Sequence, residues 1–367
     1  MVSRLLLTVS SGALALVAAC ATSAPAPRVV HTGSHALPHR ANPVVTRGRP
    51  RTGPGTVTLA FAGDVHFTGR TARLLGHPAT AFGSIASLLR RADFAAVNLE
   101  TAVTSRGKPQ PKTYHFRTTP LAFTALRAAG IDLVTMANNH VLDYGRVGLA
   151  DTLAAANSAR FPYVGIGINA AAAWAPFVTT VKGTRIAVVG VSQVAELASA
   201  WVATGNRSGE ASAISLRRTL AAVRAASRLA RTVIVFMHWG TEGEACPDAG
   251  QRSLAPKLAA AGASIIIGAH AHVLQGSGWL GRTFVAYGMG NFLWWEHSYS
   301  TATGILKLTL HPHAPLTAQF TPAVVSRTGQ PVALHGAAAR RAKAQYVGLR
   351  ACAGLAARPP GPRTGHS

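Results

Sequence analysis

Short apolar runs alternate with longer segments of helical apolar spacing along most of the chain. Runs rich in Val, Ile, Leu and aromatic residues are typical of buried strands, whereas apolar residues three or four positions apart are typical of helices. The predicted strands are 57–63, 94–97, 131–136, 163–167, 185–191, 232–237, 264–267 and 283–287, followed by a hairpin at 305–310 and 319–325. The predicted helices are 82–91, 120–129, 146–156, 214–229 and 254–261. Strands that alternate with helices in this way indicate an α/β fold.

The first twenty residues differ from this pattern. Arg4 precedes an apolar segment at 5–16, which is too short to span a bilayer comfortably. Residues 17–20, Val-Ala-Ala-Cys, resemble a bacterial lipobox, in which the signal peptide is removed and Cys20 becomes the lipidated N-terminus. We therefore expect a lipoprotein signal peptide at 1–20 and a location on the extracytoplasmic face of the bacterial cell membrane. The alternative is cleavage after an Ala-x-Ala site, which would release a secreted protein.

Three further segments follow the signal peptide. Residues 21–55 contain Ala, Pro, Ser, Thr, Arg and isolated His without periodicity, which predicts a disordered tether. Residues 56–335 hold the predicted strands and helices and form the folded domain. Residues 336–367 form an Ala/Arg-rich tail, which we expect to be helical in part and frayed at its Pro-rich end.

The chain is strongly basic, with 36 Lys and Arg against 12 Asp and Glu in 367 residues and a formal net charge of +24. The surplus is spread along the chain, and no block has the aromatic-interleaved basic pattern of a nucleic-acid-binding stripe, so nucleic acid is not an expected partner. An evenly basic surface suits acidic polymers, anionic lipid head groups or phosphorylated substrates. The other interpretation is a compositional bias towards Arg and Ala without functional meaning.

The chain contains three cysteines. If Cys20 carries lipid, Cys246 and Cys352 remain in an oxidising compartment. We predict a disulfide between these two, which would tie the C-terminal tail to the domain. Two free thiols are the alternative.

Polar residues of the metal-ligand type follow six of the predicted strands. In open α/β sheets, the crevice beyond the carboxyl ends of the strands is where ligands bind, so these side chains are expected to share one site. They combine carboxylate, amide and imidazole groups without thiolates, which suits Mn²⁺, Fe or Zn²⁺. About seven candidate ligands are too many for one tetrahedral ion and favour two divalent ions that share a carboxylate. The polar residues at the six strand ends are Asp64, His66, Glu100, Asn139, His140, His238, His270, His272 and Asn291, and the candidate ligands are all of these except His140 and Asn291.

Two more acidic residues lie close to these positions in an acid-poor chain. Asp143 is three residues after His140, and Glu242 is four residues after His238. Because metal-bound imidazoles usually donate their other N–H to a carboxylate, we expect Asp143 and Glu242 to accept hydrogen bonds from the histidines. Asn291 is more simply explained as a cap at the end of a strand.

Six ordered motifs carry a resemblance to a known family. They are Gly-Asp-Val, Val-Asn-Leu-Glu, Ala-Asn-Asn-His-x-x-Asp-Tyr-Gly, His-Trp-Gly-x-Glu, Gly-Ala-His-x-His and Gly-Asn-Phe, within residues 57–293. This set resembles the CapA family, associated with poly-γ-glutamate capsule synthesis, and more broadly the calcineurin-like metallophosphoesterase superfamily. The resemblance implies a four-layer α/β/β/α sandwich.

The resemblance also implies roles for individual residues. Asp64, His66 and His272 would hold one metal ion. Asn139, His238 and His270 would hold the other, and Glu100 would bridge the two. His140 would protonate a leaving group, so that His140 and Asp64 are the expected catalytic residues. The chain departs from the superfamily at Asn98-Leu99-Glu100, where a Gly-Asp pair usually bridges, and at Asn138, where Gly usually precedes Asn-His.

Two classes of function are compatible with these features. The first is a dimetal hydrolase that acts on a phosphoester or on an acidic polymer, either in poly-γ-glutamate synthesis or anchoring or in a role unrelated to the capsule. The second is a non-catalytic, membrane-tethered subunit that binds the polyanion or a membrane synthase subunit. The first predicts activity that depends on the metal ligands, whereas the second predicts salt-sensitive polymer binding that survives their loss.

Overall fold

Two β-sheets form the centre of the structure, a computed structural model that describes residues 46–47, 55–296 and 298–361. The eight-stranded sheet has the order β19 (Pro331–Ala333), β18 (Thr317–Val325), β17 (Ala302–Leu310), β2 (Val57–Val65), β3 (Phe94–Leu99), β6 (Leu133–Thr135) and β7 (Tyr163–Val164), with β16 (Asn291–Leu293) also paired to β2. The seven-stranded sheet has the order β1 (Thr46–Arg47), β9 (Phe177–Val181), β10 (Thr184–Ser192), β12 (Thr232–Trp239), β13 (Ile265–His270), β15 (Thr283–Ala286) and β14 (Ser277–Leu280).

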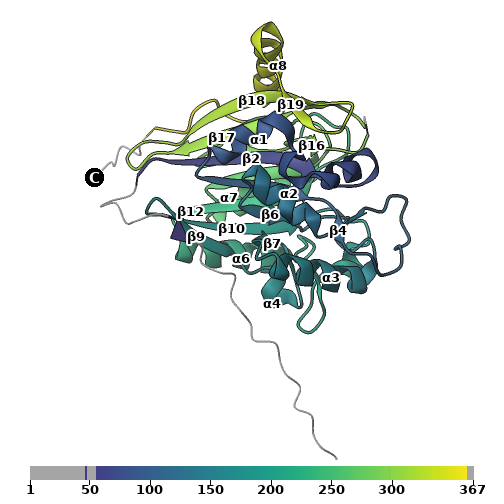
Figure 1. The fold of residues 1–367 in the computed structure, drawn as a ribbon. Helices are drawn as coiled ribbons and strands as arrows, with labels where there is room; N and C mark the ends of the chain where they lie inside the picture. Colours follow the sequence, from purple (N-terminus) through teal and green to yellow (C-terminus); the bar gives the residue numbers. More distant parts are fainter. Residues whose placement is uncertain (1–45, 48–54, 297, 362–367) are drawn as a thin grey trace, which may run out of the picture. The chain divides into compact units, whose positions relative to one another are not determined.

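Helices cover the outer face of each sheet (Figure 1). The buried residues of α1 (Ala86–Arg90), α2 (Leu121–Ala129) and α3 (Gly145–Ser158) pack on the eight-stranded sheet. Those of α4 (Ala170–Ala173), α6 (Leu216–Leu229) and α7 (Ala249–Ala260) pack on the seven-stranded sheet. The remaining elements are α5 (Ala198–Trp201), α8 (Gly336–Gly348), α9 (Arg350–Ala353), the 3-10 helices Gly69–Gly76, Pro78–Thr80 and Gly83–Ile85, and two small sheets of β4 (Ala102–Val103) with β5 (Arg117–Thr118) and β8 (Ile166–Gly167) with β11 (Gly209–Glu210).

The central strands are buried on both faces. In β2, Leu59 and Phe61 point into the core between the two sheets, while Ala60 and Ala62 face the helices. The ring centroids of Phe61 and of Phe236, from the opposite sheet, are 6.4 Å apart in an edge-to-face contact. Because both faces are covered, these strands are continuously apolar in sequence, which is why they could be recognised.

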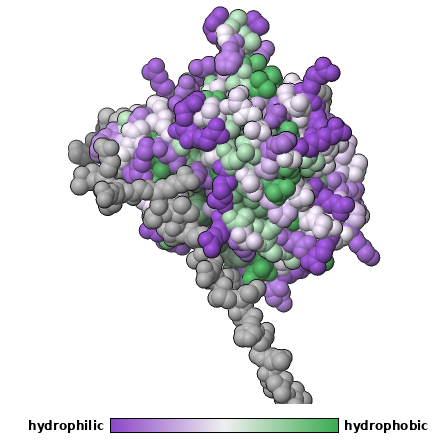
Figure 2. Space-filling model, in the orientation of Figure 1, coloured by the Kyte–Doolittle hydropathy of each residue, from purple (hydrophilic) through white to green (hydrophobic). Residues whose placement is uncertain are grey.

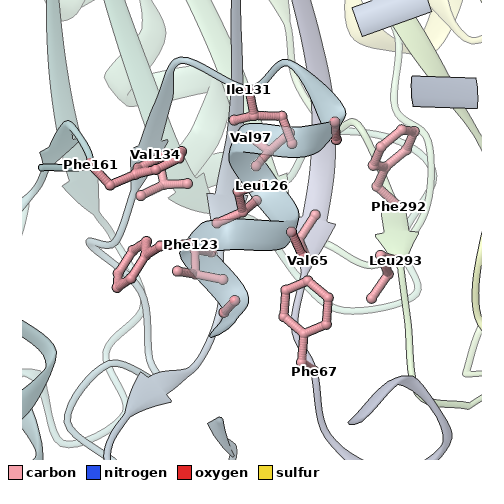
Figure 3. Close-up of a cluster of buried hydrophobic side chains, with 14 of the residues drawn as sticks. Val65, Phe67, Val97, Phe123, Leu126, Ile131, Val134, Phe161, Phe292 and Leu293 are labelled. Atoms are coloured by element: carbon pink, nitrogen blue, oxygen red, sulfur yellow. The ribbon is translucent and has the colours of Figure 1, made fainter. Parts of the chain in front are cut away.

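The outer core of the eight-stranded sheet lies beneath α2 (Figure 3). Phe123 and Leu126 of this helix pack with Val97 and Val134 of the sheet. The helix ends at Gly130, whose φ of +86° is the left-handed conformation that glycine adopts without strain. A second core lies between the seven-stranded sheet and its helices, and a third lies between the two sheets. The layers therefore follow the order α/β/β/α, and the predicted four-layer fold is confirmed.

Within the domain, the strands β9 and β14 were not predicted, and the predicted helix 82–91 is a 3-10 turn followed by the short helix α1. Other differences lie at the two ends of the domain. Thr46–Arg47 fall within the predicted tether, but they form β1 and pair with the edge strand β9, which offers unpaired backbone groups. Except for Gly55, the rest of the tether, together with the predicted signal peptide and Cys20, lies outside the described residues. No helix within 46–47, 55–296 and 298–361 combines the length and apolar character needed to cross a membrane.

The predicted tail packs against the domain instead of starting a separate segment at residue 336. Tyr346 of α8 is buried, and its ring stacks on Phe320 of β18 with centroids 3.8 Å apart. Ala356 forms a β-bridge with Trp279 of β14. Tyr346 is the one buried residue within α8, so the helix itself carries no apolar stripe that would have predicted its packing. Residues 362–367 lie outside the described part of the chain.

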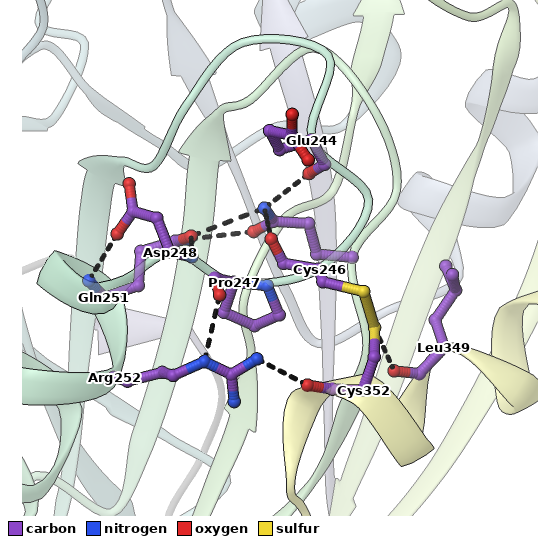
Figure 4. The surroundings of a disulfide bond; sticks show 9 residues. Glu244, Cys246, Pro247, Asp248, Gln251, Arg252, Leu349 and Cys352 are labelled. Atoms are coloured by element: carbon purple, nitrogen blue, oxygen red, sulfur yellow. Dashed lines mark hydrogen bonds between the residues drawn. A yellow bond between two sulfur atoms is a disulfide. The ribbon is translucent and has the colours of Figure 1, made fainter.

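A disulfide joins Cys246, in the loop before α7, to Cys352 of α9 (Figure 4). The two Cα atoms are 5.6 Å apart and 106 residues apart in sequence. The Arg252 side chain reinforces the link, because it donates hydrogen bonds to the carbonyl oxygens of Pro247 at 3.0 Å and Cys352 at 2.6 Å. The C-terminal helices are therefore fastened to the loop that follows β12.

Replacing both cysteines by serine is expected to lower the free energy of unfolding by about 2–4 kcal/mol, since a cross-link that closes a long loop restricts the unfolded chain. Urea denaturation measured with and without reductant tests this. Reductant should destabilise the natural chain and leave the double variant unchanged. Equal stability of both proteins under oxidising conditions would contradict the prediction.

Candidate metal centre

The predicted ligands converge where the carboxyl ends of four strands from the two sheets meet. Asp64 lies near the end of β2, and Glu100 directly follows β3 of the same sheet. His238 lies near the end of β12, and His270 ends β13 in the other sheet. Parallel pairing of β2 with β3 sets Asp64 beside Asn98, and pairing of β12 with β13 sets His238 beside Ala269. Of these four predicted ligands, the two carboxylates come from the eight-stranded sheet and the two imidazoles from the seven-stranded sheet.

The Asp64 carboxylate is fully buried and connects the two sheets. Its Oδ1 accepts a hydrogen bond from Asn98 Nδ2 at 2.8 Å, within its own sheet. Its Oδ2 accepts one from the backbone N–H of His270 at 3.1 Å, across the gap, and lies 3.5 Å from His272 Nδ1. The segment at Gly290 passes close to β2, and this close approach depends on Gly63, because a Cβ there would lie 1.7 Å from the carbonyl oxygen of Gly290.

Glu100 lies between the imidazoles and is fully buried. Its Oε2 accepts a hydrogen bond from Asn98 at 3.2 Å. Its Oε1 has no hydrogen-bond partner and lies 3.6 Å from His238 Nε2 and 3.8 Å from His140 Nε2. An unpartnered carboxylate oxygen facing several imidazoles is the arrangement that a shared cation would satisfy.

Three sets of side chains offer ligand atoms within 4.8 Å of one another. Two of them share Glu100, and each of these two also contains two of the three residues that the resemblance assigned to one metal position. The third uses Glu242 with two of the same histidines. The sets are Asp64, Glu100 and His272; Glu100, His238 and His270; and Glu242, His270 and His272.

His270 and His272 both have left-handed backbone conformations, with φ values of +88° and +56°. Such values are uncommon for residues with a side chain and are typical of strained functional positions. The conformation turns both rings into the crevice, where His270 Nδ1 is buried without a hydrogen-bond partner and His272 Nδ1 hydrogen-bonds Asn291 Oδ1 at 2.8 Å. Asn291 therefore holds a histidine of the cluster and does more than cap a strand.

His66 is next to the cluster but in none of the three ligand sets. Its ring stacks on Phe116 with centroids 4.5 Å apart and contacts the edge of Trp294 at 4.3 Å. Its Nδ1 accepts a hydrogen bond from the Thr68 N–H at 3.2 Å, and its Nε2 is buried without a partner. That free nitrogen is the atom through which His66 would reach a metal ion, so its role as a ligand stays a prediction.

Asn139 and His140 line the side of the cluster nearest α3. Asn139 Oδ1 is 2.8 Å from His238 Nε2, so this amide oxygen contacts the imidazole with which it was predicted to share an ion. His140 Nδ1 is 2.7 Å from Asp143 Oδ2, as expected, and its Nε2 faces Glu100. Burial raises the pKa of Asp143 to about 7, against the opposing influence of Lys112 and of the Phe116 N–H.

Lys112 is a buried residue of this site that the sequence analysis did not single out. Its side chain is 2% exposed, and its ammonium group lies 3.1 Å from Asp143 and 3.0 Å from Glu196. It also donates to the carbonyl oxygen of Asn139. Lys112 belongs to a polar loop whose sequence has no apolar periodicity. Its contacts with Asp143 and Glu196 therefore become visible only in the structure, where the loop lies over the strand ends.

Two aromatic side chains lie between three of the imidazoles, those of His66, His140 and His272. Phe116 lies between His66 and His140, with centroids 4.5 and 4.1 Å away. Trp294 lies between His66 and His272, with centroids 4.3 and 4.6 Å away. In the sequence, the one indication of this contact is that Phe116 and Trp294 lie in loops close to the polar motifs.

Burial controls the ionisation of the cluster. It lowers the pKa of four imidazoles well below the ordinary value, and burial followed by the nearby Asp64 charge raises the pKa of Glu100. At His272 burial also favours the neutral ring, but the hydrogen bond and charge of Asp64 outweigh it and raise the pKa. Neutral imidazole is the metal-binding form. The four histidines with lowered pKa values are His66, His140, His238 and His270.

The fold and this cluster define an α/β/β/α protein with a buried carboxylate–imidazole site between its two sheets. The chain belongs to the family described as bacterial capsule synthesis protein PGA_cap, which matches residues 58–294. The predicted CapA resemblance is thereby confirmed.

Individual relatives agree with this assignment. The chain is 30% identical over 246 residues to the capsule biosynthesis protein CapA of Bacillus anthracis, covering 65% of this chain and 59% of that one. It is 31% identical over 215 residues to the PGA biosynthesis protein CapA of Bacillus subtilis, covering 58% and 56%. The chain therefore spans less than two thirds of the length of these relatives. A solved Mycoplasma pneumoniae phosphatase aligns with a TM-score of 0.46 and 14% identity over 74% of this chain and 94% of that one.

Substitution of Lys112 by Met is expected to lower the free energy of unfolding by about 3–5 kcal/mol, because it leaves the buried Asp143 carboxylate without its cation. Lys108→Met, an exposed substitution in the same loop, is the matched control and should change stability by less than about 0.5 kcal/mol. Urea denaturation of both variants provides the comparison. If the free energy of unfolding falls no further in Lys112→Met than in Lys108→Met, the buried ammonium group is not needed for stability.

Proposed function

We propose that this protein acts in the synthesis or anchoring of poly-γ-glutamate or a related acidic polymer, and that it does so with a two-metal, hydrolase-like site. Family membership supports the capsule role, and the names of the B. anthracis and B. subtilis relatives support the polymer. The observation that carries the metal part is that two ligand sets, one from each predicted metal position, share the buried carboxylate of Glu100.

The residues present fit a pair of divalent ions. Glu100 Oε1, His66 Nε2 and His270 Nδ1 are buried polar atoms without hydrogen-bond partners, and such atoms are costly unless something binds them. Carboxylate, amide and imidazole donors without thiolate suit Mn²⁺, Fe or Zn²⁺. In this proposal, one ion is held by Asp64, His66 and His272, the other by Asn139, His238 and His270, and Glu100 contacts both.

The side chains around the pair are placed for a hydrolytic reaction. Bound divalent ions would supply Lewis-acid activation of water and of a phosphoryl or carbonyl oxygen. His140 directs Nε2 towards the cluster while its Nδ1 donates a hydrogen bond to Asp143, so Nε2 of the neutral ring is the atom that would take a proton from an attacking water and then pass it to a leaving group. Phe116 covers a face of the His140 ring, and Trp294 packs against the His272 ring, which keeps water from these faces.

The proposal places the protein on the extracytoplasmic face of the cell membrane, attached through lipid on Cys20. The support is the lipobox-like sequence that ends at Cys20 and the disulfide between Cys246 and Cys352, a bond typical of oxidising compartments. There the protein would meet the polymer and membrane synthase subunits.

A second candidate function, polyanion binding without catalysis, is favoured by the charge of the C-terminal part. No Asp or Glu follows Glu296, while Lys and Arg continue to the end of the chain. Arg340, Arg341 and Lys343 are exposed on α8, which projects beyond β18 and β19 (Figure 1). Figure 2 shows hydrophilic residues on this projecting helix, interspersed with apolar ones. A cationic helix of this kind suits an acidic polymer.

Metal content tests the first function. The full chain, purified in detergent without chelator and loaded with Mn²⁺ or Zn²⁺, is expected to hold about two ions, as a bridged pair requires. Asp64→Asn and His238→Asn should lower this number, whereas His313→Asn, an exposed control, should not. Elemental analysis gives the count. Zero or one ion in the natural chain would show that Glu100 does not bridge a pair.

Polymer binding tests the second function. Replacing Arg340, Arg341 and Lys343 by Glu should weaken binding of poly-γ-glutamate, and added salt should weaken binding of the natural chain, because screening shortens the reach of surface charges. Replacing Arg217, Arg224 and Arg228 on α6 is the matched control with the same change in net charge. Fluorescence anisotropy with labelled polymer measures the affinity. Equal losses in both triple variants would assign binding to net charge and not to α8.

A further inference from the structure

Glu242 occupies the solvent side of the candidate metal centre. It belongs to the loop between β12 and α7, and its side chain is 41% exposed, in contrast to the fully buried Asp64 and Glu100. Its Oε1 is 3.9 Å from His272 Nε2. It was expected to accept a hydrogen bond from a metal-bound histidine, yet it lies within reach of the ligand atoms themselves.

The grouping of ligand atoms sets Glu242 apart from an ordinary hydrogen-bond acceptor. It forms a set with His270 and His272, and these two histidines belong to different metal positions in the proposed pair. His270 Nδ1 is buried without a partner, so this set contains an imidazole whose free nitrogen has nothing in the described chain to bind. Glu100 touches both positions from inside the protein, and Glu242 reaches both histidines from the solvent side.

Several contacts keep the exposed carboxylate in this place. Tyr299 donates a hydrogen bond from its hydroxyl to Glu242 Oε2 at 2.8 Å, which leaves Oε1 directed at the histidines. The Tyr299 ring lies parallel to His272, with an interplanar angle of 7°, and its φ of +54° is a left-handed conformation that residues with side chains rarely adopt.

The backbone of the Glu242 loop is held as well. The Gly243 N–H donates to the carbonyl oxygen of Ala271 at 2.9 Å, which ties the loop directly to the segment between the two histidines. Gly243 itself has φ of +79°, and a Cβ there would lie 2.7 Å from the Tyr299 ring. The disulfide at Cys246 fastens the end of the loop to α9. An exposed glutamate side chain usually moves freely in solvent, so these contacts indicate that the position of Glu242 is functionally important.

We propose that Glu242 is itself a metal ligand, which closes the solvent-facing side of the centre opposite Glu100. The inference rests on the metal pair proposed above and adds a residue to it. Because its carboxylate is the exposed one, Glu242 is the ligand that an incoming anionic group could replace without unfolding the site. A carboxylate offered from solution has the same donor chemistry and should be able to take its place.

Metal affinity tests the proposal without relying on an enzymatic activity. The full chain in detergent is titrated with Co²⁺, whose visible spectrum reports the ligands around the ion. Glu242→Gln is expected to weaken Co²⁺ binding by about 10- to 100-fold and to change the spectrum, since even the partners of metal ligands affect affinity on this scale. Glu244→Gln, the same charge change two residues away, should leave affinity and spectrum as in the natural chain.

Chemical rescue gives an independent measurement. In Glu242→Ala, added acetate should restore Co²⁺ affinity and the natural spectrum, whereas chloride at the same ionic strength should not. Circular dichroism of each variant checks that the fold is retained, which the exposure of Glu242 favours.

The outcomes separate this inference from the proposed function. Two bound ions in the natural chain, with unchanged affinity and spectrum in Glu242→Gln, would overturn the role of Glu242 and leave the metal pair standing. Failure of the natural chain to bind Co²⁺ would overturn both. Rescue by acetate together with weakened binding in Glu242→Gln would establish Glu242 as a ligand.

Discussion

The site depends on the Asp64 carboxylate, because it is bound by both sheets. Asn98 holds one oxygen from within the eight-stranded sheet, and the backbone N–H of His270 holds the other from the seven-stranded sheet. Charge-assisted hydrogen bonds of this kind are stronger than neutral ones, and their strength grows in a buried setting. The relative position of the two sets of strand ends is therefore fixed by the same group that is proposed to bind a metal ion.

The remaining order in the site comes from packing around the imidazoles. Phe116 packs against the rings of His66 and His140, and Trp294 packs against the ring of His272, so that these rings are held by apolar contacts as well as hydrogen bonds. His270 and His272 have left-handed backbone conformations, whose cost must be offset by the surrounding structure. A ligand set held in this way before any ion binds loses little conformational freedom on binding, which favours high affinity.

The sequence predicted the fold and the convergence of the ligands well, for a physical reason. Strands buried on both faces are continuously apolar, and parallel strands bring their carboxyl ends to one edge, so Asp64, Glu100 and His238 could be placed together without a structure. Lys112, Phe116 and Tyr299 could not be placed, because they reach the site from loops whose course has no periodic signal. The packing of α8 through Tyr346 was missed for the same reason: a single buried residue leaves no pattern in the sequence.

The charge distribution suggests how the two candidate functions could coexist in one molecule. Asp64, Glu100 and Asp143 are concentrated in the buried site, although the chain carries a net charge of +24. A basic exterior raises the local concentration of a polyanion over distances of about a Debye length, roughly 8 Å at physiological salt. Inside the site, burial raises the pKa of Glu100 and Asp143, and the Lys112 ammonium group lies against Asp143, so the interior carries less negative charge than its three carboxyl groups suggest. Divalent ions bound there would add positive charge and would favour the approach of a polyanion from the basic surface to the site between the sheets.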